Sequence, residues 1–159
     1  MVNSEHFDLI IRNATIIDGT RMPRYAGSIG VRAGRIASIG PLDGARAESE
    51  IDASGQIAAP GFIDAHTHDD RLLLSGPDMA PKASQGVTTV ITGNCGISLP
   101  YATASDGKVV APLDLLDDGG SWFKYPSFAA YRETLEAQPA AINAACPLGH
   151  TTLRIATMD

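Results

Sequence analysis

The strongest constraint on the fold is an alternation of strand-like and helix-like segments that begins after Pro60-Gly61. The pattern predicts strands and helices in turn over residues 62–68, 77–86, 87–96, 126–139 and from 141 onward. This alternation is typical of a parallel α/β sheet. A closed (β/α)8 barrel needs about 250 residues. The 159 residues of the chain therefore predict either a small open sheet or the first βα units of such a barrel.

The residues before this alternation predict a small β-sheet module. A β-branched run covers residues 7–18, and residues 28–40 indicate a hairpin with Ala33-Gly34 near its turn. Residues 50–61 indicate a second hairpin that turns at Ser54-Gly55. We therefore expect a β module over residues 1–60 and an α/β part over residues 61–159.

Charge and composition exclude several classes of partner. Lys and Arg number 12 against 18 Asp and Glu, the formal net charge is -6, and the basic residues are not clustered. A protein that binds nucleic acid or an anionic membrane through its charge shows the opposite pattern. No apolar run approaches the ~18 residues of a membrane span. The first ten residues lack a secretory signal pattern, and two cysteines without one indicate reduced thiols. We expect a cytoplasmic protein.

The stretch GFIDAHTHDD, residues 61–70, places two histidines at the end of a predicted strand. Residues two apart in a strand share a face, so Asp64, His66 and His68 are predicted to project together. Two neutral imidazoles on one face can hold a divalent cation, and Asp64 could orient a ligand. A pair of exposed histidines beside solvated acids fits the same spacing. The position favours a metal, because ligand sites of α/β proteins gather where strands end.

The stretch TGNCGIS, residues 92–98, places Cys95 at the end of the next predicted strand. A thiolate there is a candidate zinc ligand and a candidate nucleophile, and a buried structural cysteine is the alternative. His150, in LGHTTLR, ends a third candidate strand and is either a site residue or a hydrogen-bonded loop histidine. Because both motifs end parallel strands, we expect His66, His68 and Cys95 to converge at one edge of the sheet.

Taken together, the stretches APGFIDAHTHDD and PDMAPKASQGVTTVITGNCGIS, with GHTTLR later in the chain, resemble the N-acyl-D-amino-acid deacylases, or D-aminoacylases, of the amidohydrolase superfamily. The resemblance runs over nearly the whole chain, and GNCG after HTHDD is far more specific than the histidine pair alone. It implies a metal-dependent (β/α)8 barrel with a small β module. This chain would hold the N-terminal portion, so that the barrel is incomplete in it.

The resemblance also implies a chemistry. The family hydrolyses the amide bond of small-molecule N-acyl-D-amino acids with zinc, so one or two zinc ions are expected. By resemblance His66 and His68 are ligands of one metal position. Cys95 is a ligand of a tighter, neighbouring position, and its sulfur is able to bridge the two positions. His150 is a candidate substrate contact. The family's further histidine ligands and its acidic general base lie downstream, so no catalytic residue is expected in this chain.

The favoured hypothesis is the N-terminal part of a zinc-dependent N-acyl-D-amino-acid deacylase, whose isolated 159-residue chain is inactive. Another amidohydrolase, such as a hydantoinase or a dihydroorotase, is the alternative enzyme, and Cys95 within GNCG argues against it. A hypothesis from a different class is a non-catalytic fragment that assembles with other chains through exposed strand edges.

Overall fold

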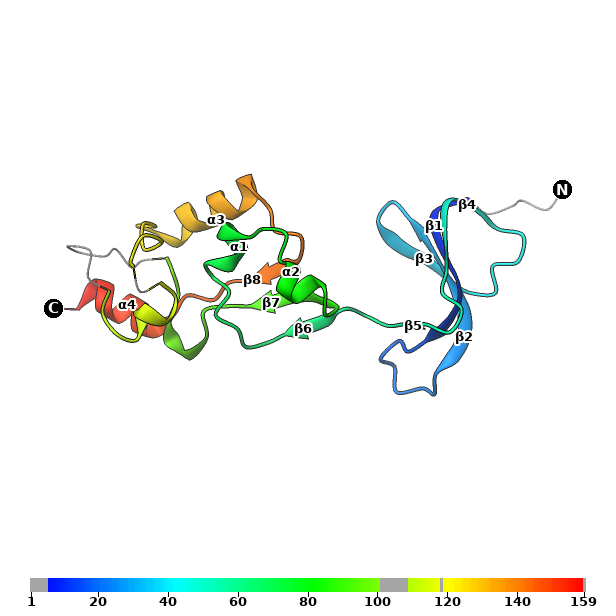
Figure 1. Cartoon of the computed structure of the whole chain (residues 1–159), viewed down its shortest axis with the longest axis horizontal. Helices are drawn as coiled ribbons and strands as arrows, with labels where there is room; N and C mark the ends of the chain where they lie inside the picture. The colour runs from blue at the N-terminus through cyan, green and yellow to red at the C-terminus, as the bar shows by residue number, and fades with distance from the viewer. Residues whose placement is uncertain (1–5, 101–108, 118, 159) are drawn as a thin grey trace. The chain divides into compact units, whose positions relative to one another are not determined.

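The computed structural model describes residues 6–100, 109–117 and 119–158. The chain divides into two compact units, Met1–Pro60 and Gly61–Asp159, and each contains its own sheet (Figure 1). Within the described residues, no helix has the length and apolar character needed to cross a membrane.

The first unit is a five-stranded sheet in the order β3-β2-β1-β4, with β5 also paired to β1. Its strands are β1 (His6–Ile16), β2 (Tyr25–Arg32), β3 (Arg35–Gly40), β4 (Arg46–Asp52) and β5 (Ile57–Ala58). β1 pairs antiparallel with β2 and parallel with β4 and β5. The core of the unit is built on this central strand, whose buried side chains are those of Phe7, Ile10, Ala14 and Ile16.

The hairpin predicted over residues 28–40 is confirmed. β2 and β3 pair antiparallel, and the residues that join them, Ala33 and Gly34, have φ angles of 51° and 71°. Two successive residues with positive φ are what a tight two-residue hairpin turn requires, because this twist matches that of the flanking strands.

The second hairpin predicted, over residues 50–61, is wrong. β4 and β5 both run parallel to β1, so the chain does not reverse between them. A turn closed by Gln56 N donating to Ala53 O (2.9 Å) interrupts the strand instead. β1 holds the chain on both sides of this turn, since Ala53 N donates to Arg12 O and Thr15 N donates to Gln56 O. The predicted turn does form at Ser54-Gly55, but the strands on both sides of it pair with β1 and not with each other.

The second unit contains a parallel sheet in the order β6-β7-β8, which confirms the predicted α/β architecture. Its strands are β6 (Phe62–Asp64), β7 (Val87–Ile91) and β8 (Asn143–Ala145). Its helices are α1 (Leu72–Ser75), α2 (Ala80–Ala83), α3 (Phe128–Ala137) and α4 (His150–Thr157), with 3-10 turns at Asn94–Gly96 and Leu113–Leu115. Short α1 was not predicted from the sequence.

Helix α3 connects the core of this unit to the segment that follows β6. The helix lies within the segment predicted over residues 126–139, and Ser127 caps its start, with Oγ accepting a hydrogen bond from Ala130 N at 3.2 Å. Tyr131, on the inner face of α3, is fully buried. Its hydroxyl donates to the backbone oxygen of Asp70 at 3.0 Å. The core thereby fixes the end of the HTHDD stretch.

The edge strand β6 exposes two large apolar side chains. Within the described residues β6 and β8 are edge strands with one partner each. Phe62 and Ile63 of β6 are 66% and 64% exposed. Exposed apolar strands at a sheet edge are surfaces that other strands can cover, as expected for strands of a larger barrel.

Candidate metal centre

The candidate site forms where two neighbouring parallel strands end. Asp64, the last residue of β6, pairs with Val90 near the end of β7. His66 and His68 follow the first strand, and Cys95 lies in the 3-10 turn that follows the second. Because parallel strands present their carboxyl ends at the same edge of a sheet, the two motifs meet although Cys95 lies 27 positions after His68 in the sequence.

The histidines reach this edge by a different route from the one predicted. The strand expected over residues 62–68 ends at Asp64, so strand alternation does not place the two rings on one face. Asp64 Oδ1 accepts a hydrogen bond from the backbone N of His66 at 3.2 Å, and such local side-chain bonds compete with a strand ladder. The backbone N of Thr67 still donates to Ile91 O at 3.2 Å.

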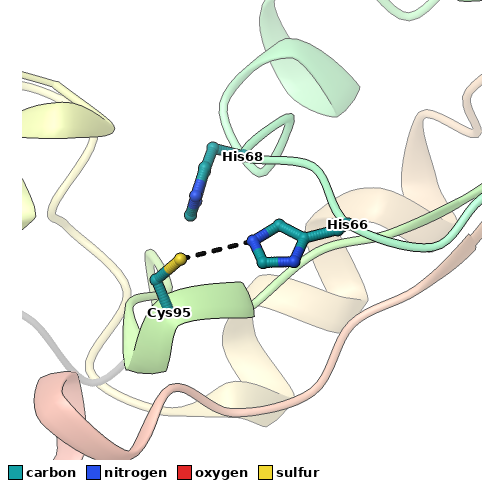
Figure 2. A group of neighbouring side chains, drawn as sticks. All are labelled: His66, His68 and Cys95. Atoms are coloured by element: carbon teal, nitrogen blue, oxygen red, sulfur yellow. Dashed lines mark hydrogen bonds between the residues drawn. The ribbon is translucent and has the colours of Figure 1, made fainter.

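The structure brings the three candidate ligands together. Nε2 of His66 lies 3.3 Å from Sγ of Cys95, and the ring of His68 faces the same space (Figure 2). One ligand atom from each of the three side chains lies within 4.8 Å of the others. The two imidazole centroids are 5.8 Å apart, with the rings steeply inclined. The two histidines and the cysteine therefore form one cluster.

This cluster fits a zinc ion. Bond lengths of ~2.0–2.3 Å in a tetrahedral site separate ligand atoms by roughly 3.4–3.6 Å. The 3.3 Å separation between His66 Nε2 and Cys95 Sγ is close to this value, and all three ligand atoms lie within 4.8 Å of one another. Thiolate and imidazole are ligands that suit zinc and do not suit magnesium or calcium. His68 Nδ1 is buried and has no hydrogen-bond partner in the described part of the chain, as fits a nitrogen whose partner comes from outside the protein.

Cys95 has a left-handed backbone conformation, and the residues next to it hold it there. Its φ and ψ are 55° and 17°, in the left-handed region, which costs a non-glycine residue on the order of 1–2 kcal/mol. Gly93 before it also has positive φ, and a Cβ there would overlap the carbonyl oxygen of Pro147. The side chain of Asn94 donates to Ile91 O at 2.6 Å and to Thr67 O at 3.3 Å. Asn94 thereby joins the cysteine turn to the histidine segment.

A charged network lies beside the histidines. Nζ of Lys82, on α2, lies 2.6 Å from Asp64 Oδ2 and 3.0 Å from Asp69 Oδ2. Thr67 Oγ1 donates to Asp69 Oδ2 at 2.6 Å and accepts from Lys82 at 3.2 Å. The hydrogen bond from Lys82 lowers the pKa of Asp64, and the same bond raises the pKa of Lys82. Both groups are therefore charged at neutral pH.

The second acid of HTHDD, Asp70, differs from Asp69 in being fully buried. Asp70 is 1% exposed, and burial raises its pKa to about 6, against the opposing effect of nearby backbone N–H groups. Its Oδ2 has no hydrogen-bond partner among the described residues. Among the described residues, Asp70 is not one of the three whose ligand atoms gather at the cluster.

His150 and Cys146 are not among the described residues whose ligand atoms gather at this cluster. The third predicted strand ends at Ala145, and His150 is the exposed first residue of α4, so its expected place at a strand end is wrong. Its role as a substrate contact stays a prediction. Cys146 is half-buried and packs against the core, and burial raises the pKa of its thiol.

Two site residues were missed from the sequence, Lys82 and Asn94. The pattern around Lys82 is that of a surface lysine in a short helix, and nothing local connects it to Asp64, 18 positions earlier. Asn94 had a weak signal, since an asparagine between glycines after a strand often makes side-chain bonds to the backbone.

Comparison with known proteins agrees with this geometry. Residues 49–159 match the model of the amidohydrolase family. The chain is 54% identical over 156 residues, 98% of its length, to a D-aminoacylase of Alcaligenes xylosoxydans xylosoxydans. It superposes on a D-aminoacylase crystal structure, described for its binuclear metal center, with a TM-score of 0.89, 53% identity and 96% of the chain covered.

An N-acyl-D-glutamate deacylase from Bordetella bronchiseptica, solved with zinc and a phosphonate inhibitor, superposes with a TM-score of 0.87, 45% identity and 97% of the chain covered. The chain spans about a third of the length of these relatives: 32% of the Alcaligenes sequence, 31% of the D-aminoacylase structure and 32% of the Bordetella structure.

Proposed function

The chain belongs to the amidohydrolase family, and on that premise we propose that it takes part in zinc-dependent hydrolysis of N-acyl-D-amino acids. The products would be a carboxylate and a free D-amino acid. The observation that carries the proposal is the meeting of His66, His68 and Cys95 within 4.8 Å. The substrate class is supported by the names of the relatives, D-aminoacylase and N-acyl-D-glutamate deacylase.

Each of the three side chains has a role in this proposal. His66 and His68 would hold one metal position, and Cys95 would supply a thiolate ligand to a position beside it. Zinc bound by such ligands supplies Lewis acidity that polarises an amide carbonyl and makes water nucleophilic near neutral pH. The thiolate form of Cys95 contributes a negative charge close to both imidazoles.

The surrounding residues keep these ligands in place. Asn94 ties the cysteine turn to Thr67, between the two histidines. Gly93 allows the backbone to approach Pro147, before α4, and Gly96 allows it to approach Thr151, in the first turn of α4. The ligand cluster contains no carboxylate among the described residues, so the proposal leaves the general base outside it.

Metal binding tests the proposal directly. Cobalt(II) added to the metal-free protein should give visible d–d bands and a near-ultraviolet thiolate charge-transfer band. Cys95→Ala should abolish the charge-transfer band. Cys146→Ala is the matched control, because it removes the other thiol, and it should leave that band intact. A band that disappears only with Cys146, or no cobalt binding at all, would contradict the proposed ligand set.

Activity is tested by a chimera. In the chimera, this chain replaces the segment of the Alcaligenes D-aminoacylase that aligns with it over 156 residues at 54% identity. The chimera should release free D-amino acid from N-acetyl-D-amino acids, and His66→Ala and Cys95→Ala should remove most of this activity. A folded, zinc-loaded chimera without turnover would count against the proposal.

The alternatives give different outcomes. Hydrolysis of hydantoin or dihydroorotate by the chimera, without hydrolysis of N-acyl-D-amino acids, would favour another amidohydrolase activity. Light scattering on the 159-residue chain addresses the assembly hypothesis. A defined oligomer that binds no zinc would favour the non-catalytic fragment.

A further inference from the structure

The two candidate histidine ligands lie on a segment that no strand ladder fixes. β6 ends at Asp64, and residues 65–68 belong to no helix or strand. Two hydrogen bonds hold the middle of the segment, from Thr67 N to Ile91 O at 3.2 Å and from Asn94 Nδ2 to Thr67 O at 3.3 Å. Neither bond reaches the two flanks of the segment, on which the direction of each imidazole depends.

A single ammonium group holds both flanks. Lys82 Nζ lies 2.6 Å from Oδ2 of Asp64, before the histidines, and 3.0 Å from Oδ2 of Asp69, after them. It also donates to Thr67 Oγ1, in the middle, at 3.2 Å. One side chain therefore contacts the beginning, the middle and the end of the same short segment.

These contacts continue to the ligands themselves. Asp64 receives Lys82 on one carboxylate oxygen, and its other oxygen accepts the backbone N–H of His66 at 3.2 Å. Asp69 directly follows His68 in the chain. The Asp64 carboxylate therefore acts directly on the backbone of His66, and Asp69 anchors the chain at the residue next to His68.

Lys82 is itself anchored and partly shielded from water. It lies on α2, which packs against β7, and the residue before that helix, Met79, is fully buried. The side chains of Lys82, Asp64 and Asp69 are 20%, 30% and 16% exposed. Such a network is stiffer than a pair of fully solvated surface ions, whose geometry is weakly held.

From these contacts we propose that Lys82 is a positioning residue of the metal centre, which sets the separation of the His66 and His68 imidazoles by bridging Asp64 and Asp69. The inference rests on the proposed function, since it concerns the same ligand cluster. Lys82 is not a ligand, because an ammonium group has no lone pair to offer. It acts through the two carboxylates in the way that outer-shell partners of metal ligands do.

If Lys82 acted only through its charge, neutralising it would change zinc affinity in the opposite direction from that expected of a positioning residue. Removing a positive charge near a cation site strengthens cation binding through Coulomb attraction. Loosening the backbone of two ligands weakens it, by about 10–100-fold for outer-shell groups. The sign of the change in zinc affinity therefore separates the two roles.

The experiment measures zinc affinity of the 159-residue chain by competition with a chromophoric chelator at fixed pH. Lys82→Met should weaken binding by about 10–100-fold, and Lys82→Arg should restore most of the loss, because a guanidinium can bridge the same two carboxylates. Lys124→Met is the matched control. It removes the same charge from a lysine that contacts the rings of Trp122 and Tyr125, and it should leave the affinity unchanged.

Cobalt(II) spectra add a second measurement. In Lys82→Met the thiolate charge-transfer band of Cys95 should persist while the d–d bands weaken, since only the histidine segment is loosened. Circular dichroism of the metal-free variant checks its fold, and Lys82→Gln takes its place if methionine unfolds the chain. Unchanged or tighter zinc binding by folded Lys82→Met or Lys82→Gln would overturn the inference about Lys82 and leave the proposed metal centre standing. Failure of the wild-type chain to bind zinc or cobalt would instead overturn the proposed metal centre.

Discussion

Replacing Asp70 by asparagine should remove a specific pH dependence from the stability of the protein. The carboxyl of Asp70 is buried, and its pKa in the folded protein is about 6. In the unfolded chain an aspartate titrates near ~3.9. The difference of about 2 pKa units corresponds to about 3 kcal/mol of free energy of unfolding, at about 1.4 kcal/mol per unit.

Whether stability rises or falls with pH depends on which state, folded or unfolded, retains the proton of Asp70. Below about pH 4 both states are protonated at Asp70, and its full contribution to stability is present. Between about pH 4 and pH 6 the unfolded chain releases the proton while the folded protein retains it, so stability falls as pH rises. Above pH 6 both states are ionised and the loss of about 3 kcal/mol is complete. Asparagine does not titrate, so Asp70→Asn lacks this decline.

The assay is urea unfolding of the metal-free protein at pH 4, 5, 6 and 7, followed by circular dichroism. Relative to wild type, Asp70→Asn should become about 3 kcal/mol more stable on going from pH 4 to pH 7. Comparing the two proteins cancels the opposite pH dependence of carboxyls with lowered pKa, such as Asp64 and Glu50. Asp114→Asn, an exposed carboxyl of the same unit, is the control and should run parallel to wild type. Parallel profiles for wild type and Asp70→Asn would refute the reasoning.

Three further results are expected. Gly93→Ala should cost at least about 1 kcal/mol of stability and weaken zinc binding, because a Cβ at this left-handed position overlaps Pro147 O and displaces Cys95; equal urea midpoints and equal chelator competition would contradict this. Ser127→Ala should cost about 1 kcal/mol through loss of the cap on α3, whereas Ser127→Thr should retain most of the stability in the same unfolding assay. The 159-residue chain alone, supplied with zinc, should release negligible D-amino acid from N-acetyl-D-amino acids, since no carboxylate joins its described ligand cluster; robust turnover that Cys95→Ala abolishes would show a complete site.

The sequence by itself determined the parallel α/β architecture and the position of the site within it. Strand periodicity, the helical segment over residues 126–139 and glycines at the turns are local signals, because each depends on residues that are close together in the sequence. The histidine pair and Cys95 each lie at the end of a predicted strand, so the rule that parallel strands end at one edge was enough to bring His66, His68 and Cys95 together. The hairpin at Ala33-Gly34 was predictable for the same reason, because its turn is defined by two residues.

Tertiary structure decided every feature that depends on a partner far along the chain. The turn at Ser54-Gly55 could not reveal that the strands on both sides of it pair with β1. The strand before His66 was expected to continue, but Asp64 turns its side chain to the backbone N of His66 and to Lys82, which only folding brings near. Hydrogen bonds and ion pairs act over a few ångströms, and the sequence does not record which distant groups will come within that range.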